Sequence, residues 1–366
     1  MIRRLAAPLR WVARFRAAAI GLAVCTGVAT FAVGPSPLEA QTELPPPAGV
    51  ERLFESPAPL VLRIEADLSA LRGDRDEEND ERPARLVIVD GTDGEAAFDV
   101  ELRTRGNFRL QSNVCPFPPL RLDVPRRQME GTAFEGQDKL KMVTHCRDTP
   151  GWDRHALREF LVYRIYNRFS EASFQVRLAR VTWVDTGGAE PLERWAFLLE
   201  SEDALAQRLG GTWFPEDEPP VDPARIGDLD AVRLDLFQYL VGNTDYSIYG
   251  LHNVVVLMPP EGRWITIPYD FDWTGFVDAP YAAPDPSLGI DDVRERTYRG
   301  LCRPRMDYAS VYALFLGERA AVEALVRDQP GLDDESRADL LEFLEPFWDT
   351  LSNPDRARRA IERECR

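Results

Sequence analysis

The sequence predicts an α+β protein with a β-rich first part and a mainly helical second part. Short runs of alternating apolar and polar residues, the period of a half-buried strand, recur between residues 59 and 200. Apolar residues spaced three or four apart, the period of an amphipathic helix, dominate from residue 201 to residue 366. The chain is 44% hydrophobic and 10% aromatic, which is enough apolar material for a buried core.

In the first part, alternation predicts successive strands and one helix. The expected strands are residues 59–64, 84–89, 98–103, 120–124, 139–143, 176–184 and 195–200. A helix is expected over 155–169, where apolar residues are spaced four apart. Together they suggest an antiparallel sheet interrupted by one helix.

In the second part, helical spacing alternates with one hairpin. Helices are expected over residues 229–240, 311–326 and 334–351. Strands over 254–258 and 264–267 flank a turn of the sequence PPEG. The second of these strands runs directly into the sequence PYDFDW.

The first forty residues have the pattern of a secretory signal peptide. Five arginines precede or begin an apolar run at residues 17–33, and Ala40 is a small residue before the expected cleavage point. The alternative is an uncleaved membrane anchor, for which this run is short. Loss of five Arg and one Glu on cleavage changes the net charge from −17 to −21. We expect an exported, periplasmic or extracellular protein with no transmembrane span after cleavage and a Pro-rich linker at 41–58.

Export to an oxidising compartment would allow the cysteines to form disulfides. Four remain after cleavage: Cys115, Cys146, Cys302 and Cys365. An even number in an oxidising compartment predicts disulfides, and four cysteines allow three pairings. Proximity in sequence favours Cys115–Cys146 and Cys302–Cys365. A zinc site is not indicated, because the chain has neither CxxC nor HExxH spacing.

The charges argue against a nucleic-acid partner and single out two lysines. With 44 Lys+Arg against 61 Asp+Glu, the chain has no basic surplus to displace phosphate counterions. Only Lys139 and Lys141 are lysines, and both lie on one predicted strand. Alternate strand residues share a face, and the compact ammonium group suits phosphate oxygens. The alternative is two ordinary surface lysines.

Acidic and amide residues in the second part point to a metal and an acid–base group. Asp245 and Asn253 are separated by a short loop, so the carboxylate can deprotonate a hydroxyl and the amide oxygen can ligate Mg²⁺. Asp270 and Asp272 follow an apolar strand and can place a carboxylate on the same metal. The alternatives are an Asx-rich turn and a helix N-cap. The order of lysine strand, helix with Glu159, Asp–Asn loop, hairpin and Asp is the order that kinase-type phosphoryl transfer requires.

With these motifs the sequence resembles the CotH-type spore-coat kinase family over residues 60–320. The motifs are RTRGN at 103–107, LK at 140–141, LREFLVYR at 157–164, FLLE at 197–200, GNTD at 242–245, HN at 252–253 and PYDFD at 268–272. The GNTD and HN segments are also similar to the HipA-type kinases. The resemblance implies a divergent protein-kinase-like bilobal fold, with a β-rich N-terminal lobe at 59–200 and a mainly helical C-terminal lobe at 201–366.

The resemblance also implies roles for residues of the first part. Lys141, or else Lys139, would hold the nucleotide phosphates, and Glu159 would orient that lysine. Glu200 would lie near the hinge that faces the adenine. The chain departs from the family in having CPFPP at 115–119 where a lysine is expected after the RGN segment, and no Gly-rich phosphate loop is evident.

In the second part, the resemblance makes Asp245 the catalytic acid/base. Asn253 and Asp270 would hold Mg²⁺ or Mn²⁺, with Asp272 as the alternative ligand. Two functions follow as hypotheses. The first is an exported, Mg²⁺/ATP-dependent phosphotransferase acting on a protein or small hydroxyl acceptor. The second is a catalytically inactive module for binding or envelope assembly. A third, a metal-dependent hydrolase, is disfavoured by the presence of only three histidines.

Overall fold

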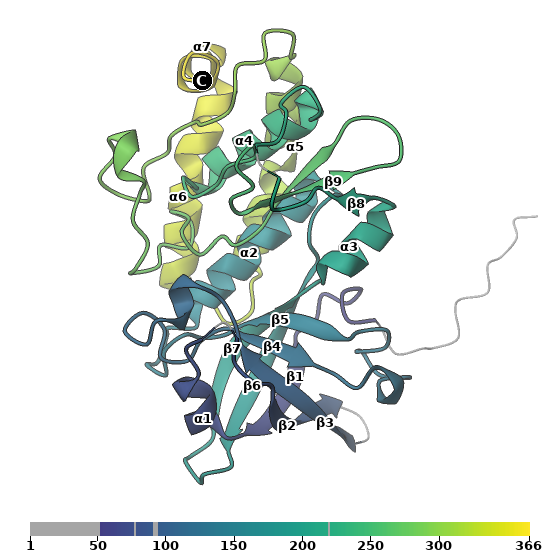
Figure 1. Cartoon of the computed structure of the whole chain (residues 1–366). Helices are drawn as coiled ribbons and strands as arrows, with labels where there is room; N and C mark the ends of the chain where they lie inside the picture. The colour runs from purple at the N-terminus through teal and green to yellow at the C-terminus, as the bar shows by residue number, and fades with distance from the viewer. Residues whose placement is uncertain (1–51, 77, 91–93, 219) are drawn as a thin grey trace, which may run out of the picture. The chain divides into compact units, whose positions relative to one another are not determined.

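Seven strands close into a barrel in the computed structural model, which describes residues 52–76, 78–90, 94–218 and 220–366 (Figure 1). The strands are β1 (Leu60–Ala66), β2 (Arg82–Asp90), β3 (Gly94–Thr104), β4 (Leu120–Asp123), β5 (Lys139–Val143), β6 (Val176–Asp185) and β7 (Leu192–Leu199). Their order around the barrel is β1-β2-β3-β4-β5-β7-β6, and β6 returns to β1. Each strand therefore pairs on both sides, which leaves its backbone groups satisfied.

The pairing is mixed because β1 and β6 run parallel. Leu60 lies opposite Ala179, and the register continues to Ala66 opposite Asp185. The other pairs around the barrel are antiparallel. Alternate residues of the strands point inward and are fully buried, among them Leu62, Ile64, Leu86, Leu102, Leu122, Leu140, Val181 and Trp183. The strand alternation thus supplies one packed interior.

The expected bilobal protein-kinase-like fold is wrong. The chain contains a closed mixed barrel of seven strands, and helices make up about a third of it. Alternation locates strands but does not say which strands pair, so the sequence did not reveal that β1 joins β6 and closes the sheet. The individual elements lie close to their expected positions. The strands at 139–143 and 254–258 have the expected bounds.

Beyond the barrel, the regular elements of the described chain are mostly helices. The helices are α1 (Leu68–Gly73), α2 (Arg154–Phe169), α3 (Glu202–Leu209), α4 (Asp228–Val241), α5 (Tyr308–Arg327), α6 (Asp334–Ser352) and α7 (Pro354–Ala357), with short turns η1 (Phe108–Leu110), η2 (Arg126–Gln128), η3 (Pro286–Leu288) and η4 (Arg358–Glu362). A second sheet has the order β10-β9-β8, with β8 (Thr212–Trp213), β9 (Val254–Met258) and β10 (Ile265–Pro268).

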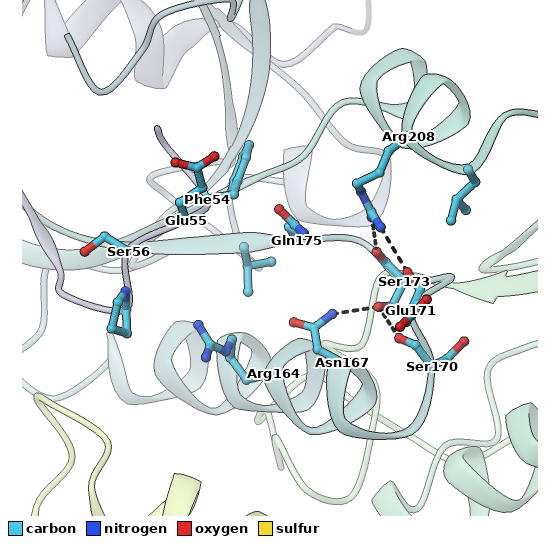
Figure 2. Close-up of a pocket in the computed structure, with 13 residues that line it drawn as sticks. Phe54, Glu55, Ser56, Arg164, Asn167, Ser170, Glu171, Ser173, Gln175 and Arg208 are labelled. Atoms are coloured by element: carbon cyan, nitrogen blue, oxygen red, sulfur yellow. Dashed lines mark hydrogen bonds between the residues drawn. The ribbon is translucent and has the colours of Figure 1, made fainter. Parts of the chain in front are cut away.

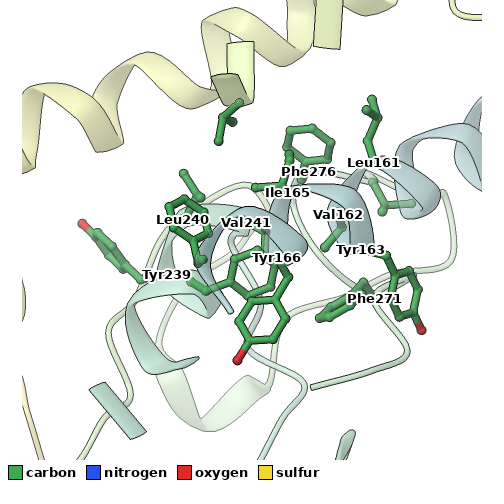
Figure 3. Close-up of a cluster of buried hydrophobic side chains, with 14 of the residues drawn as sticks. Leu161, Val162, Tyr163, Ile165, Tyr166, Tyr239, Leu240, Val241, Phe271 and Phe276 are labelled. Carbon is green, nitrogen blue, oxygen red and sulfur yellow. The ribbon is translucent and has the colours of Figure 1, made fainter. Parts of the chain in front are cut away.

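Helix α2 is the centre of the helical core. Most of its residues are buried, and it packs against α5, α4 and strand β7. Figure 3 shows its Tyr163 beside Phe271, which follows β10. The ring of Phe271 is fully buried, with its centroid 4.7 Å from that of Tyr163 and 5.7 Å from that of Phe237 on α4. An aromatic residue so enclosed fixes the two acids on either side of it, Asp270 and Asp272.

Both expected disulfides are confirmed. Cys115 is bonded to Cys146 and Cys302 to Cys365, with Cα–Cα distances of 4.7 and 4.8 Å. The expected signal peptide at 1–40 and most of the linker at 41–58 lie outside the described residues, while the described residues, from 52 onward, group as one unit. Within the described ranges, no helix combines the length and apolar character needed to cross a bilayer.

Reduction of the two disulfides is expected to destabilise the protein. They close loops of 31 and 63 residues in sequence separation, and a disulfide typically contributes about 2–4 kcal/mol by restricting the unfolded chain. Thermal melts with and without a phosphine reductant measure the effect. The paired variants Cys115→Ser/Cys146→Ser and Cys302→Ser/Cys365→Ser separate the two contributions. An unchanged melting temperature on reduction would contradict the expectation.

Candidate functional site

A buried arginine gathers three carboxylates where the barrel meets α2 and the segment after β10. Arg109, on η1, lies 2.9 Å from Glu159 of α2, 2.8 Å from Asp270 and 3.3 Å from Asp272. The arginine and Glu159 are 9% and 2% exposed. A single guanidinium thus faces three carboxyl groups in a site with little water. Their mutual repulsion must therefore raise the pKa of at least one of them.

The pKa values of the two aspartates of this cluster, Asp270 and Asp272, are shifted in opposite directions. Burial raises the pKa of Asp272 well above its ordinary range. The positive charge of Arg109 lowers this pKa, but the negative charges of Asp270 and Glu159 raise it further. Tyr281 donates a hydrogen bond to Asp272 across 2.9 Å. For Asp270, desolvation alone would raise the pKa, but the arginines outweigh it and hold the pKa below its usual value. Asp270 is therefore the ionised, partly exposed member of the pair, with 40% of its side chain accessible.

A second cluster forms in the loop after α4. Asn253 donates from Nδ2 to the Asp245 carboxylate at 3.0 Å and to the Asp245 carbonyl at 2.7 Å. Nε2 of His252 lies 2.8 Å from the other carboxylate oxygen. About a third of the Asp245 side chain remains exposed, 35%. Nδ2 is occupied, and within the described residues the Asn253 Oδ1 has no hydrogen-bond partner, so this amide oxygen is available to a ligand.

The β9–β10 hairpin joins the two clusters. Val254 lies opposite Pro268, and the Tyr269 N–H donates to the Asn253 carbonyl at 3.0 Å. Asn253 and Asp270 therefore flank the same end of the hairpin. Both have a left-handed backbone, with φ of 52° and 57°. Such conformations are uncommon outside glycine and concentrate at functional sites, although Asn and Asp tolerate them best.

Helix α2 holds the segment that carries Asp270. The Asp270 N–H donates to the Tyr163 hydroxyl across 2.9 Å, and Phe271 packs against the ring of the same tyrosine. The position of the carboxylate is thus set by a hydrogen bond and by aromatic packing from one helix. The structure places Asp270 and Asp272 together on Arg109, and Asp245 together with Asn253 in the other cluster; the link between the two clusters is the backbone of the hairpin.

The expected pairing of a lysine with Glu159 requires correction. Glu159 pairs with Arg109, while Lys141 pairs with Glu202 at 2.6 Å. Lys141 also stands 5.8 Å from the centre of the Tyr269 ring, and its charge helps to lower the pKa of Asp270 after those of the arginines. Lys141 is therefore near the cluster although it does not meet Glu159.

Lys139 and Glu200 are placed differently from Lys141. Lys139 forms ion pairs with Glu81 at 3.1 Å and Asp123 at 2.9 Å on the barrel. Glu200 is 4% exposed and binds Arg208 through both carboxylate oxygens, at 3.0 and 2.8 Å. In the described chain these contacts give the Lys139 ammonium group and both Glu200 carboxylate oxygens partners within the protein.

Sequence reasoning missed the arginines of the site. Arg105 and Arg109 belong to the RGNFRL segment, and the charge of Arg105 acts on Asp270. Within the described residues the Arg105 guanidinium makes no ion pair or hydrogen bond, and burial lowers its pKa despite Asp270. Because the chain has 42 arginines, the fact that these two residues are arginines did not single them out as site residues. The available signal was their position within or just after RTRGN, one of the motifs that carry the resemblance.

The Asp245 loop is tied to α4 by a buried carboxyl group. Tyr246 donates to Asp235 at 2.9 Å, and Asp235 is 4% exposed. Burial raises the pKa of Asp235 to about 7, even though the hydrogen bond from Tyr246 opposes the shift. At acidic pH this group is protonated in the folded protein and ionised in the unfolded chain.

A pH-dependent loss of stability is expected from Asp235. Below pH ~4 both states hold the proton; between about 4 and 7 only the unfolded chain releases it, so the free energy of unfolding falls as pH rises. Above about 7 this contribution stays constant. The fall amounts to a few kcal/mol, since one unit is about 1.4 kcal/mol. Urea unfolding of wild type and Asp235→Asn at pH 4.5–8 measures it. The variant, which keeps an acceptor for Tyr246, should lose this slope; equal slopes would refute the assignment.

Comparison of the sequence with protein-family models and with curated proteins found no match. No protein-family model matches the chain, and no curated protein is significantly similar to it. The candidate site therefore stands on its geometry.

Proposed function

We propose that this protein is an exported, divalent-cation-dependent phosphotransferase that uses ATP at the cluster of Asp245, Asn253 and Asp270. The observation that carries the proposal is the β9–β10 hairpin, which joins the backbone of Asn253, whose amide oxygen is free, to that of Tyr269, the residue before the ionised Asp270. Carboxylate and amide oxygens are the ligands that Mg²⁺ prefers, and Mg²⁺ keeps several waters or phosphate oxygens in its shell. Mg²⁺ or Mn²⁺ held there would offset the repulsion between a triphosphate and this acidic chain.

Asp245 is the proposed acid–base group. Its carboxylate is partly exposed and is oriented by hydrogen bonds from Asn253 and contact with His252. A carboxylate oriented in this way accepts the proton of an attacking hydroxyl group. The acceptor is a protein or small molecule that offers such a hydroxyl.

The proposed phosphate contacts come from the cations that face Asp270. Arg105 carries a guanidinium without a carboxylate partner, and Lys141 has one exchangeable partner, Glu202. Phosphoryl transfer depends mainly on positioning and on charge stabilisation of the transferred group. Arg105 thus takes the role that the resemblance gave to lysine alone.

One observation favours the second function, a non-catalytic binding or envelope-assembly module. Arg109 already compensates Glu159, Asp270 and Asp272 within the chain. Acids that already have a cationic partner, or that burial holds protonated, need no metal to be accommodated in the fold. The two functions differ in whether Asp270 still binds a cation.

Calorimetric titration with a non-hydrolysable ATP analogue distinguishes the two functions. In the presence of Mg²⁺ or Mn²⁺, we expect the intact protein to bind the analogue, and Asp270→Ala to weaken binding at least tenfold. Glu81→Gln is the matched control, since it removes an acid from the barrel cluster of Glu81, Glu101 and Asp123. Absence of cation-dependent binding by the intact protein would support the non-catalytic module.

A further inference from the structure

A cavity of about 470 Å³ lies beside α2, bordered by the chain before β1 and the start of β6 (Figure 2). It shares no lining residue with the cluster of Asp245, Asn253 and Asp270. Its size falls in the range of small-ligand sites. Phe54, Pro57, Val176 and Leu209 form apolar parts of its wall, and the remaining lining is polar.

The cavity contains an unpaired cation, Arg164. Figure 2 shows its side chain rising from α2 toward the cavity without a hydrogen bond to the residues drawn. Within the described residues, no carboxylate pairs with Arg164; burial and the charge of Arg168 lower its pKa. Arg168 itself binds Glu318 at 2.8 Å. A half-buried guanidinium with five donors and no acceptor is costly unless an anion joins it.

Arg208, at the other end of the cavity, provides the contrast. Its guanidinium is engaged by both oxygens of Glu200 and by the carbonyls of Glu171 and Ser173. Of the two arginines in the cavity, Arg208 thus has partners within the protein for its guanidinium, and Arg164 has none among the described residues. The two acids on its rim, Glu55 and Glu171, are exposed, so water screens their charges.

Two amides complete the polar wall. Asn167, one turn after Arg164 on α2, donates from Nδ2 to Ser173 Oγ at 2.8 Å and to the Phe174 carbonyl at 2.9 Å. Its amide oxygen Oδ1 is left to accept a hydrogen bond from another group. Within the described chain, the Gln175 side chain makes no hydrogen bond. An amide acceptor and a free amide suit the N–H and C=O of a peptide group.

A second cavity, of about 330 Å³, shares Pro57 and Arg164 with the first. Six of its other lining residues are apolar, Phe160, Leu178, Ala321, Ala324, Leu325 and Pro330, and three are polar, Arg168, Asp328 and Gln329. Arg164 therefore lies between a mainly polar cavity and a mainly apolar one. A ligand that satisfies both would carry a negative charge between an amide and an apolar group.

We propose that these paired cavities bind a carboxylate flanked by an amide and an apolar side chain, as at the C-terminus of a peptide that ends in an apolar residue. Arg164 receives the carboxylate through a two-point charge-assisted contact. The last side chain enters the apolar cavity, and the preceding peptide group faces Asn167 and Gln175. A free N-acylated apolar amino acid offers the same chemistry, so the ligand has two possible sources.

Calorimetry with N-acetyl-Ala-Leu on the full chain tests this inference. We expect the free acid to bind at least tenfold more tightly than its C-terminal amide, which has the same shape without the charge. N-acetyl-leucine separates the sources: tighter binding of the dipeptide indicates a peptide C-terminus, and equal binding indicates the free amino acid. Equal binding of acid and amide, or no binding of the acid at millimolar concentration, would overturn the proposal.

Variants separate binding from folding. Arg164→Met should weaken binding of the acid at least tenfold without lowering the melting temperature, because it removes an uncompensated cation. Arg180→Met is the matched control: Arg180 is exposed on β6, paired with Glu193, and should leave binding unchanged. Unaltered affinity in Arg164→Met would contradict the assignment of this arginine. Should that variant fail to fold, the comparison of acid with amide on the wild type still decides the question.

Discussion

Arg109→Met is expected to lower the free energy of unfolding by about 3–5 kcal/mol, the largest effect on stability foreseen for one substitution. The variant leaves Glu159 and Asp272 buried without their cation, and Asp270 loses its 2.8 Å partner. Removal of one member of a buried ion pair costs more than the pair itself contributes, because the remaining charge is desolvated. Urea unfolding at pH 7 measures the loss.

Two further variants make this result specific. Arg109→Met combined with Glu159→Gln should recover part of the loss, because the second change removes a buried charge. Arg180→Met, at a pair in which both side chains are about half exposed, should cost less than about 1 kcal/mol. A loss in Arg109→Met as small as that control would show that the acids relax to water without their arginine.

Asp245→Asn is expected to reduce phosphoryl transfer by about 10²–10⁴-fold, the range that a general acid–base group contributes. The amide cannot accept the hydroxyl proton, yet it keeps an oxygen for the hydrogen bond from Asn253. The loop should therefore remain in place and the melting temperature nearly unchanged. Release of ADP from ATP in the presence of Mg²⁺, with and without added hydroxyl acceptors, measures the activity.

Asp333→Asn provides the matched control for that substitution. Asp333 caps α6 by accepting from the Ser336 N–H at 2.7 Å, a role that asparagine also fills. It should retain both activity and stability. If Asp245→Asn instead lowers the melting temperature strongly, Asp245 belongs to a structural turn and the proposed role fails.

The sequence predicted local elements well because periodicity is a local property. The strand at 254–258, its partner after the PPEG turn and the acids behind it were all placed by alternation and turn residues. The two disulfides followed from an even cysteine count and short separations. These features suffice to bring Asn253 and Asp270 to one end of a hairpin.

Barrel closure escaped prediction because it depends on a contact between distant segments. The parallel register of β1 with β6 joins residues more than a hundred positions apart, and no motif in either strand specifies the partner. Glu159 shows the same limit. Its helix position was expected, but its partner Arg109 lies on a short turn that no periodic pattern marks.

The rarity of lysine in this chain did not indicate a shared role for Lys139 and Lys141. Lys139 and Lys141 do lie two apart on one strand, as expected. Two residues along a strand are nevertheless several ångströms apart, so the two side chains meet different neighbours: Asp123 and Glu81 for one, Glu202 and Tyr269 for the other. The proposal for the phosphate contacts therefore rests on neighbouring charges rather than on residue type.

An anomalous-difference map from crystals grown with Mn²⁺ and a non-hydrolysable ATP analogue tests the proposed site most directly. The proposal predicts a manganese peak about 2.1 Å from Asn253 Oδ1 and from an Asp270 carboxylate oxygen, the spacing of a hard octahedral cation. A peak only at Glu81, Glu101 and Asp123, or none beside ordered nucleotide, would contradict it.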